Sequence, residues 1–215
     1  MPKPVILDKS HLDAIFALHQ DSIGVEACPD HVKPEERSFF ESILDGRGLI
    51  IGIFDDQLIA YGVLQTIHAA EENTHKVLSL APEVKIARLA GAAVADAWRG
   101  QDLHSTLIHA RVQAAEENTL LFSTAAPANY ASWSNLLSQC FPIHAIVPKF
   151  GGFTRYLMVH DQQAFDTAST FAVDPLDVPR QKALLHNGYR GYSVVTLASG
   201  ERAILYAKSS LQLSR

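Results

Sequence analysis

Residues 49–67 place two apolar runs on either side of a two-residue acidic turn, and this feature constrains the fold more than any other. Residues 49–54 and 57–67 are rich in branched and aromatic side chains, and Asp55-Asp56 separates them. Two apolar runs joined by a tight Asp turn are typical of a β-hairpin. The segment therefore predicts two consecutive antiparallel strands.

The remainder of the chain mixes helical and strand patterns. The spacing of apolar residues predicts helices near residues 10–22, 34–45, 103–118 and 129–139, and strands at residues 3–8, 84–94, 119–123, 143–148 and 153–160. Residues 68–82 are polar and irregular and predict a loop. Hairpins and crossover connections occur together, so the fold class is α/β or α+β with a mixed sheet.

Past residue 160 the pattern changes. Residues 162–179 are polar and interrupted by proline, and residues 177–187 have a helical pattern. Residues 189–197 and 202–208 predict a second hairpin across Ser199-Gly200. We expect a main domain over residues 1–160 and a C-terminal extension over residues 161–215, packed on the core or on a partner subunit.

Composition excludes several classes of function. The 18 Lys and Arg residues and the 23 Asp and Glu residues give a formal net charge of −5, with no basic run to bind nucleic acid. No apolar run approaches the roughly 20 residues of a membrane helix, and the N-terminus lacks the apolar stretch of a signal peptide. Cys28 and Cys140 are far apart and in no metal-like pairing, so we expect a cytoplasmic protein without a metal site.

Residues 94–107 carry the clearest chemical signal. A strand ends, a short loop follows and a helix begins at about Leu103. The first turn of a helix presents N–H groups that have no acceptor inside the helix, together with the positive end of the helix dipole, and this suits a pyrophosphate. Arg99 adds a positive charge beside it. An ordinary strand–helix connection is the alternative.

The order of elements around this segment resembles the GNAT superfamily of acyl-CoA-dependent N-acetyltransferases. The hallmark of that family is Val-x-Pro-x-Tyr-Arg-Gly-x-Gly-x-Gly, from the end of the fourth strand into the next helix. At the matching positions this chain reads Val94, Asp96, Trp98, Arg99, Gly100, Asp102 and His104. Asn129 and Cys140-Phe141 are similar to a second family pattern, and the resemblance covers roughly residues 3–160.

The resemblance implies a mixed, mostly antiparallel sheet flanked by helices, and acetyl-CoA as the cosubstrate. Backbone groups of Ala92, Ala93 and Val94 would hold the pantetheine arm and polarise the thioester carbonyl. Asn129 would contact the pantetheine or only cap its own helix. The pyrophosphate would lie against Arg99, Gly100, Gln101, Asp102, Leu103, His104, Ser105 and Thr106.

Two glycines of the family pattern are replaced, by Asp102 and His104. A carboxylate at position 102 should repel a phosphate, unless it turns outward and caps the helix. A protonated His104 would offset that charge, since the ordinary pKa of histidine is near ~6.5. We therefore expect weaker, pH-sensitive binding of CoA, unless both side chains turn to solvent.

The usual catalytic groups are also replaced. Some family members carry a glutamate base where this chain has Arg88, and many carry a tyrosine acid where it has Leu136. Arg88 would either bind an acidic acceptor or be paired structurally. Substitute bases on the substrate side are Glu83 and His31, followed by Asp30, His68, Glu71 and Glu72; the alternative for each is a solvated loop residue. Tyr130 is near the position of the family tyrosine in sequence, but a helical turn or more away from it. Many direct-transfer enzymes use a chain of water molecules instead.

The sequence is compatible with three functions. The first is an N-acetyltransferase that acts on the amine of a small molecule or peptide. The second is a catalytically impaired GNAT-like protein that binds acyl-CoA or has a regulatory role. The third is an unrelated α/β protein. The family often forms dimers, so a homodimer is possible.

Overall fold

The computed structural model describes residues 3–23, 31–68 and 73–210. These residues form two compact units, Met1–Leu121 and Phe122–Arg215. Strand β5 (Leu120–Ala125) begins in the first unit and ends in the second. This division does not test the predicted domain boundary after residue 160, which stays a prediction.

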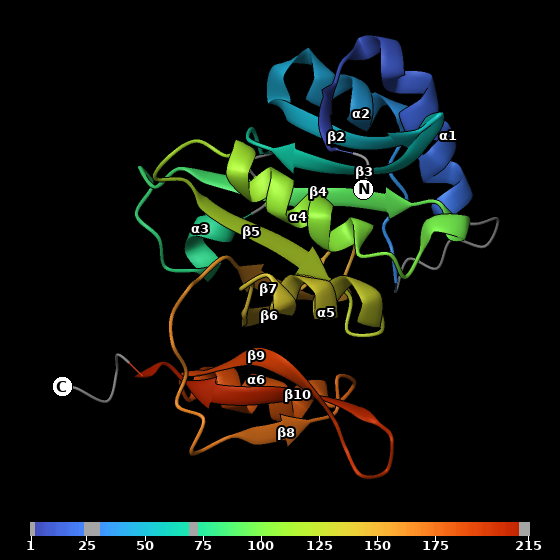
Figure 1. Ribbon diagram of the computed structural model, residues 1–215. Helices are drawn as coiled ribbons and strands as arrows, with labels where there is room; N and C mark the ends of the chain where they lie inside the picture. The colour runs from blue at the N-terminus through green and yellow to red at the C-terminus, as the bar shows by residue number, and fades with distance from the viewer. Residues whose placement is uncertain (1–2, 24–30, 69–72, 211–215) are drawn as a thin grey trace. The chain divides into compact units, whose positions relative to one another are not determined.

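The first unit is an antiparallel sheet with helices on both faces (Figure 1). Its strands, in the order β1-β2-β3-β4, are β1 (Val5–Leu7), β2 (Gly48–Asp55), β3 (Gln57–Gln65) and β4 (Ile86–Val94). Its helices are α1 (Leu12–Ile23), α2 (Arg37–Ser42), α3 (Thr74–Val77) and α4 (Leu103–Ala114). Short 3₁₀ turns precede α1, at Lys9–His11, and α4, at Asp96–Trp98.

The predicted hairpin is confirmed as β2 and β3. Asp55 pairs with Gln57, so Asp56 alone turns the chain, and its φ of 58° lies in the left-handed region. Aspartate enters that region more readily than most residues because its short side chain can hydrogen-bond locally. The turn chemistry therefore explains why two acidic residues stand between two apolar runs.

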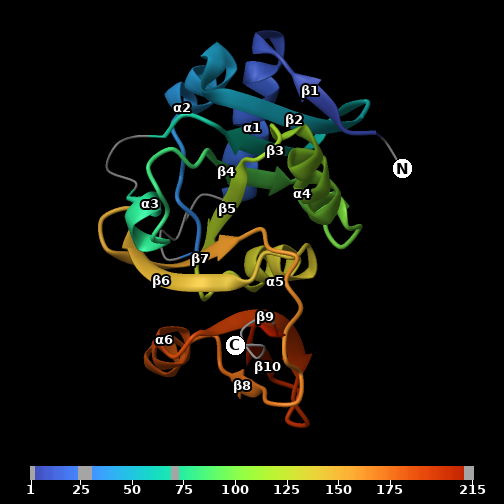
Figure 2. The same ribbon diagram turned by 90° about the vertical axis from the view of Figure 1, so that its left-hand side faces the viewer.

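The two faces of this sheet have separate cores. On one face α1 and α2 pack over residues that include Ile50, Tyr61 and Val63. On the other face α4 packs over Ile51 and Ala60, among others. Figure 2 shows α2 and α4 on opposite sides of the strands. Side chains of a strand alternate between its faces, which is why neighbouring residues of β2 and β3 enter different cores.

The second unit is a sheet in the order β5-β7-β6-β9-β10-β8, with antiparallel pairing throughout. Its remaining strands are β6 (Ile143–Lys149), β7 (Phe153–Val159), β8 (Phe171–Val173), β9 (Tyr189–Thr196) and β10 (Arg202–Lys208). Its helices are α5 (Tyr130–Ser138) and α6 (Val178–His186). The helix and hairpin predicted in the C-terminal segment are thus confirmed.

Two elements were missed from the sequence. Residues 68–82 were predicted as a loop but include α3, and the polar segment 162–179 includes β8. Both elements are four residues or shorter, too short for apolar periodicity to reveal. Ahead of α1, the side chain of Asp8 caps the 3₁₀ turn Lys9–His11.

A buried amide joins α6 to β10 and to the residues that follow β8. Gln181 is fully buried, and its Nε2 donates to the carbonyls of Asp174 and Pro175 at 3.1 and 2.8 Å. Its Oε1 accepts the hydroxyl of Tyr206 on β10 at 2.7 Å, and Tyr156 on β7 donates to Pro175 at 2.7 Å. One side chain thus ties α6 both to β10 and to residues 174–175.

We predict that Gln181→Ala lowers the free energy of unfolding by roughly 2–4 kcal/mol, because it removes the acceptor of the Tyr206 hydroxyl and leaves a void. Gln163→Ala, an exposed glutamine of the same segment, should change it by less than about 0.5 kcal/mol. Urea unfolding followed by circular dichroism measures both. Equal stabilities of the two variants would contradict a structural role for Gln181.

Candidate functional site

The C-terminal end of β4 places the three residues proposed for the pantetheine arm. Val94, Ala93 and Ala92 pair with residues 60, 61 and 62 of β3. Leu89 pairs with residue 64, so three steps along β4 match two along β3. This β-bulge bends the strand just before Ala92, which is exposed.

The turn between β4 and α4 contains the residues expected from the sequence to contact a pyrophosphate. Gly100 and Asp102 both have left-handed φ values, of 76° and 57°. The family pattern places glycine at these two positions, and glycine enters this region without strain. Asp102 therefore keeps the glycine-like conformation although the residue is changed.

Arg99 lies at the start of the same turn. Its guanidinium forms an ion pair with Asp96 at 2.7 Å and lies 3.5 Å from the carbonyl oxygen of Ser22 in α1. The side chain is 56% exposed, so the pair is open to solvent and easily exchanged. Arg99 is thus held near the N-terminus of α4 and can still move toward an anion.

The side chain of Asp102 does not cap α4, and that part of the prediction was wrong. Its carbonyl instead accepts the backbone N–H and the hydroxyl of Thr106, at 2.9 and 3.1 Å. A residue in the left-handed region does not have the extended backbone of an N-cap, which removes the usual capping geometry. The Asp102 side chain is exposed, so solvent screens its charge.

His104 does not supply the compensating positive charge considered from the sequence. Burial, followed by the nearby charge of Arg111, lowers the pKa of His104 to about 3. Its imidazole is therefore neutral at neutral pH.

Arg111 holds α4 on the sheet. It is completely buried, and burial lowers its pKa to about 9, so it stays charged at neutral pH. Its Nε donates to the carbonyl of Leu107 at 3.0 Å and its Nη1 to that of Val63 at 3.3 Å. A Cβ on Gly62 would lie 2.8 Å from the Arg111 Nε, so glycine makes room for this side chain.

Arg88 is 6% exposed and lies on the face of the sheet that α1 and α2 cover. It pairs with Gln65 in the β3–β4 register, and its Nη2 donates to the Gln65 Oε1 at 2.7 Å. Gln65 follows Tyr61 and Val63 on the same face of β3. Burial and this contact match the structural alternative and fix the orientation of the guanidinium.

The proposed acids and bases that the structure describes come from separate segments of the chain. Glu83 is exposed in the turn before β4, and His31 is exposed at the start of the segment that leads to α2. In the second unit, Tyr130 is the first residue of α5. The guanidinium carbon of Arg202 lies over the Tyr130 ring, 3.9 Å from the ring centroid. Asp30, Glu71 and Glu72 lie outside the described residues.

Asn129 caps α5. Its side-chain oxygen accepts the backbone N–H of Ser132 at 3.1 Å. Leu136, at the position of the family tyrosine, is 2% exposed and apolar, so it supplies no proton. Capping is therefore sufficient to explain Asn129, and its contact with pantetheine stays a prediction.

A buried polar cluster near the C-terminal end of β4 was not predicted from the sequence. His19 on α1 lies 2.9 Å from the Tyr61 hydroxyl through its Nδ1, and its Nε2 accepts the backbone N–H of Glu35 at 3.0 Å. Because Nε2 accepts, the imidazole proton is on Nδ1 and is donated to Tyr61. Burial lowers the pKa of His19, and burial with the Glu35 charge raises that of Tyr61. The position of His19 four residues after Ile15, within the apolar stripe of α1, was the available signal.

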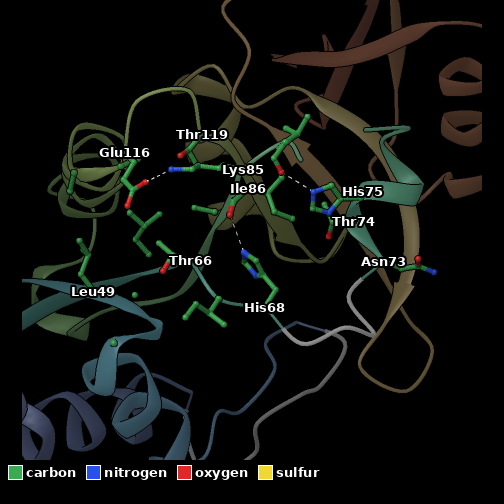
Figure 3. Close-up of a pocket in the computed structure, with 18 of the residues that line it drawn as sticks. Leu49, Thr66, His68, Asn73, Thr74, His75, Lys85, Ile86, Glu116 and Thr119 are labelled. Carbon is green, nitrogen blue, oxygen red and sulfur yellow. Dashed lines mark hydrogen bonds and ion pairs between the residues drawn. The ribbon is translucent and has the colours of Figure 1, made fainter. Parts of the chain in front are cut away.

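A cavity of about 860 Å³ lies at the opposite end of β4 (Figure 3). Strands β2, β3 and β4 and the end of α4 line it, together with α3 and the segments on either side of that helix. Two histidines, His68 and His75, point toward the segment that leads into β4.

Among the described residues, no three His, Cys, Asp or Glu side chains are grouped to hold a metal ion. No helix in the described part of the chain is long and apolar enough to cross a membrane.

Solved structures of N-acetyltransferases have a fold similar to that of this chain. The ribosomal-protein-S18-alanine N-acetyltransferase from Escherichia coli aligns over 76% of this chain and 97% of its own, with 17% identity and a TM-score of 0.54. NAA60 from Arabidopsis thaliana in complex with acetyl-CoA aligns over 74% and 98%, with 16% identity and a TM-score of 0.60. The chain has the GNAT fold. The fold predicted from residues 94–104 and their surroundings is confirmed.

A probable acetyltransferase from Staphylococcus epidermidis shares the GNAT fold as well, over 75% of this chain and 99% of its own, with 18% identity and a TM-score of 0.56. No protein-family model and no curated protein sequence matches the chain significantly. At these identities the likeness concerns the fold alone.

The pKa of His104 predicts how stability depends on pH. The folded pKa lies below the unfolded value near ~6.5, so the stability due to neutral His104 is complete above that pH and is lost as pH falls toward 3. His104→Gln should therefore reduce the acid-induced loss of stability, by up to about 1.4 kcal/mol per pH unit. His109→Gln, an exposed histidine of α4, is the control. Urea unfolding at several pH values tests this, and parallel curves for wild type and His104→Gln would refute it.

Proposed function

We propose that the chain is an acyl-CoA-dependent N-acetyltransferase that transfers an acetyl group from acetyl-CoA to the amine of a small molecule or peptide. The observation that carries this proposal is the turn before α4. Two residues with left-handed φ, Gly100 and Asp102, stand where the family places glycine, and they lead into the first turn of α4 on a GNAT fold. That backbone suits a pyrophosphate.

The backbone N–H groups at the start of α4 would bind the pyrophosphate, with Arg99 as the nearby cation. The first turn of a helix presents N–H groups at its positive end, and a twelve-residue helix has a full dipole behind them. Arg99 would leave Asp96 or share it, since an exposed pair costs little to exchange. Backbone groups of Ala92, Ala93 and Val94 would hold the pantetheine arm.

The reaction is a direct transfer. The amine nitrogen attacks the thioester carbonyl carbon, the C–N bond forms, and the C–S bond breaks. The amine loses one proton to a base or to water, and CoA leaves as the thiolate or thiol. N–H groups of β4 near Ala92 would stabilise the negative oxygen of the tetrahedral intermediate. We propose Glu83, His31 and Tyr130 as candidates for the proton transfers.

Arg88 is proposed to favour an acceptor that carries a carboxylate. Its guanidinium lies on the α1 and α2 face of β4, oriented by Gln65. A planar guanidinium recognises a carboxylate through two parallel hydrogen bonds. A buried structural arginine is the alternative.

A GNAT-like protein that binds acyl-CoA without transfer is the second candidate. Buried Leu136 and Arg88 occupy the positions of the family acid and base, and this observation favours it. The two candidates differ only in turnover, because both require the same phosphate-binding turn.

We predict that Asp102→Gly tightens the binding of CoA. The substitution removes a carboxylate beside the proposed phosphates and keeps the left-handed backbone. We expect a severalfold to roughly tenfold lower Kd by calorimetry, and the gain should shrink as salt is added. Asp56→Gly is a matched control, because Asp56 has a φ of 58° in the β2–β3 turn, away from α4. An equal effect of both substitutions would exclude the carboxylate as the cause.

We predict that the protein releases free CoA thiol from acetyl-CoA when an amine substrate is present. A panel of amino acids, polyamines and peptides with free N-termini, followed with a thiol reagent, identifies the acceptor. Binding of acetyl-CoA without thiol release for any amine supports the second candidate. No binding of acetyl-CoA in a thermal-shift assay would reject both candidates.

A further inference from the structure

The cavity at the N-terminal end of β4 has the features of a small-molecule site. Its volume of about 860 Å³ lies within the usual range of ligand pockets, roughly 300–1,000 Å³. Leu49 from β2, Leu64 from β3 and Ile86 from β4 form apolar walls. Hydroxyl and charged side chains, including Thr66 and Lys85, stand at other points around it (Figure 3).

Hydrogen bonds to three consecutive carbonyls, those of residues 84–86, hold the backbone around Lys85 in place. His75 Nε2 lies 2.9 Å from the carbonyl oxygen of Val84, and His68 Nε2 lies 3.3 Å from that of Ile86. A carbonyl only accepts, so both imidazoles carry their proton on Nε2 and donate it. The backbone N–H of Leu120 donates to the carbonyl of Lys85 at 2.9 Å. The pairing of β3 with β4 ends at Gln65 and Arg88, so Lys85 lies beyond it. These three hydrogen bonds hold the Lys85 segment in place instead.

Lys85 and Glu116 place opposite charges side by side at the cavity. The Lys85 ammonium lies 2.9 Å from a carboxylate oxygen of Glu116, just after α4. The two side chains are 67% and 73% exposed. Ion pairs this exposed contribute little to stability, so a ligand can replace their mutual contact at small cost. The site thus offers one cation and one anion to a ligand whose own charges are adjacent.

An α-amino acid matches this arrangement. Its carboxylate and ammonium groups are attached to one carbon atom, which places them side by side. The carboxylate would bind to Lys85 and the ammonium to Glu116. A large apolar side chain would be buried against Leu49, Leu64 and Ile86, where burial of apolar surface supplies most of the affinity.

We propose that this cavity is a binding site for an α-amino acid with a large apolar side chain, held as the zwitterion. The site is separate from the proposed phosphate-binding turn. Ile86 and Val94 are the two ends of β4, and eight residue steps along a strand span roughly 25 Å. The proposal concerns binding alone and does not depend on the proposed acetyl transfer.

Calorimetry with L-leucine and L-phenylalanine, in the absence of CoA, tests the proposal. We expect saturable binding with a Kd between about 10 μM and 1 mM. Three probes of similar size isolate the charge requirement: 4-methylpentanoic acid lacks the ammonium, 3-methylbutylamine lacks the carboxylate, and 6-aminohexanoic acid separates the two charges. All three should bind about tenfold more weakly or not at all. Equal binding of any of the three would overturn the zwitterion assignment.

Three variants locate the site. Lys85→Ala and Glu116→Ala should each weaken the binding of leucine about tenfold or more. Lys9→Ala removes one partner of the exposed Lys9–Asp45 pair, which lies outside the cavity, and should leave binding unchanged. Thermal melting confirms that each variant is folded. Wild-type affinity in both cavity variants, or no binding of leucine or phenylalanine up to about 10 mM, would refute the proposal. Loss of CoA binding or of transfer would not affect this result, so the two proposals fail separately.

Discussion

A single buried arginine sets the position of α4 on the sheet. The Arg111 guanidinium is completely buried and carries its charge into a space that exists because Gly62 has no side chain. Burying a cation is costly, and hydrogen bonds to the carbonyls of Leu107 and Val63 offset part of that cost. Because one of these carbonyls belongs to α4 and the other to β3, the bonds fix the helix against the strand. The position of the turn at the N-terminus of α4 therefore depends on this contact.

The parts of the fold that follow a regular period were predictable. Both hairpins were visible as paired apolar runs, and the turn between β2 and β3 was visible in Asp55-Asp56. The passage from β4 into α4 was visible because apolar spacing changes from alternate residues to every third or fourth residue. Arg99 and Gly100 singled out the turn before α4 for the proposed pyrophosphate site. That Asp102 would adopt the backbone of the glycine it replaces was a matter of conformation, which residue type alone does not fix.

Features that depend on contacts between distant segments could not be predicted. The low pKa of His104 depends on the burial of its imidazole and on the charge of Arg111, seven residues away on the same helix. The cavity depends on how a long connection folds against the end of β4, and α3 in that connection is a single turn. The proton acceptor of the proposed reaction is unassigned for the same reason, since Glu83 and His31 come from segments without a regular pattern.

The tautomer of His19 couples acidity to one particular connection. Its Nε2 accepts the N–H of Glu35, so a second proton on the ring would meet a donor instead of an acceptor. Protonation must therefore break the bond that ties the segment before α2 to α1, while the backbone pairing of β2 and β3 keeps its own hydrogen bonds. Acid strong enough to protonate His19 would thus release the connection into α2. This connection lies on the face of the sheet that also carries Arg88.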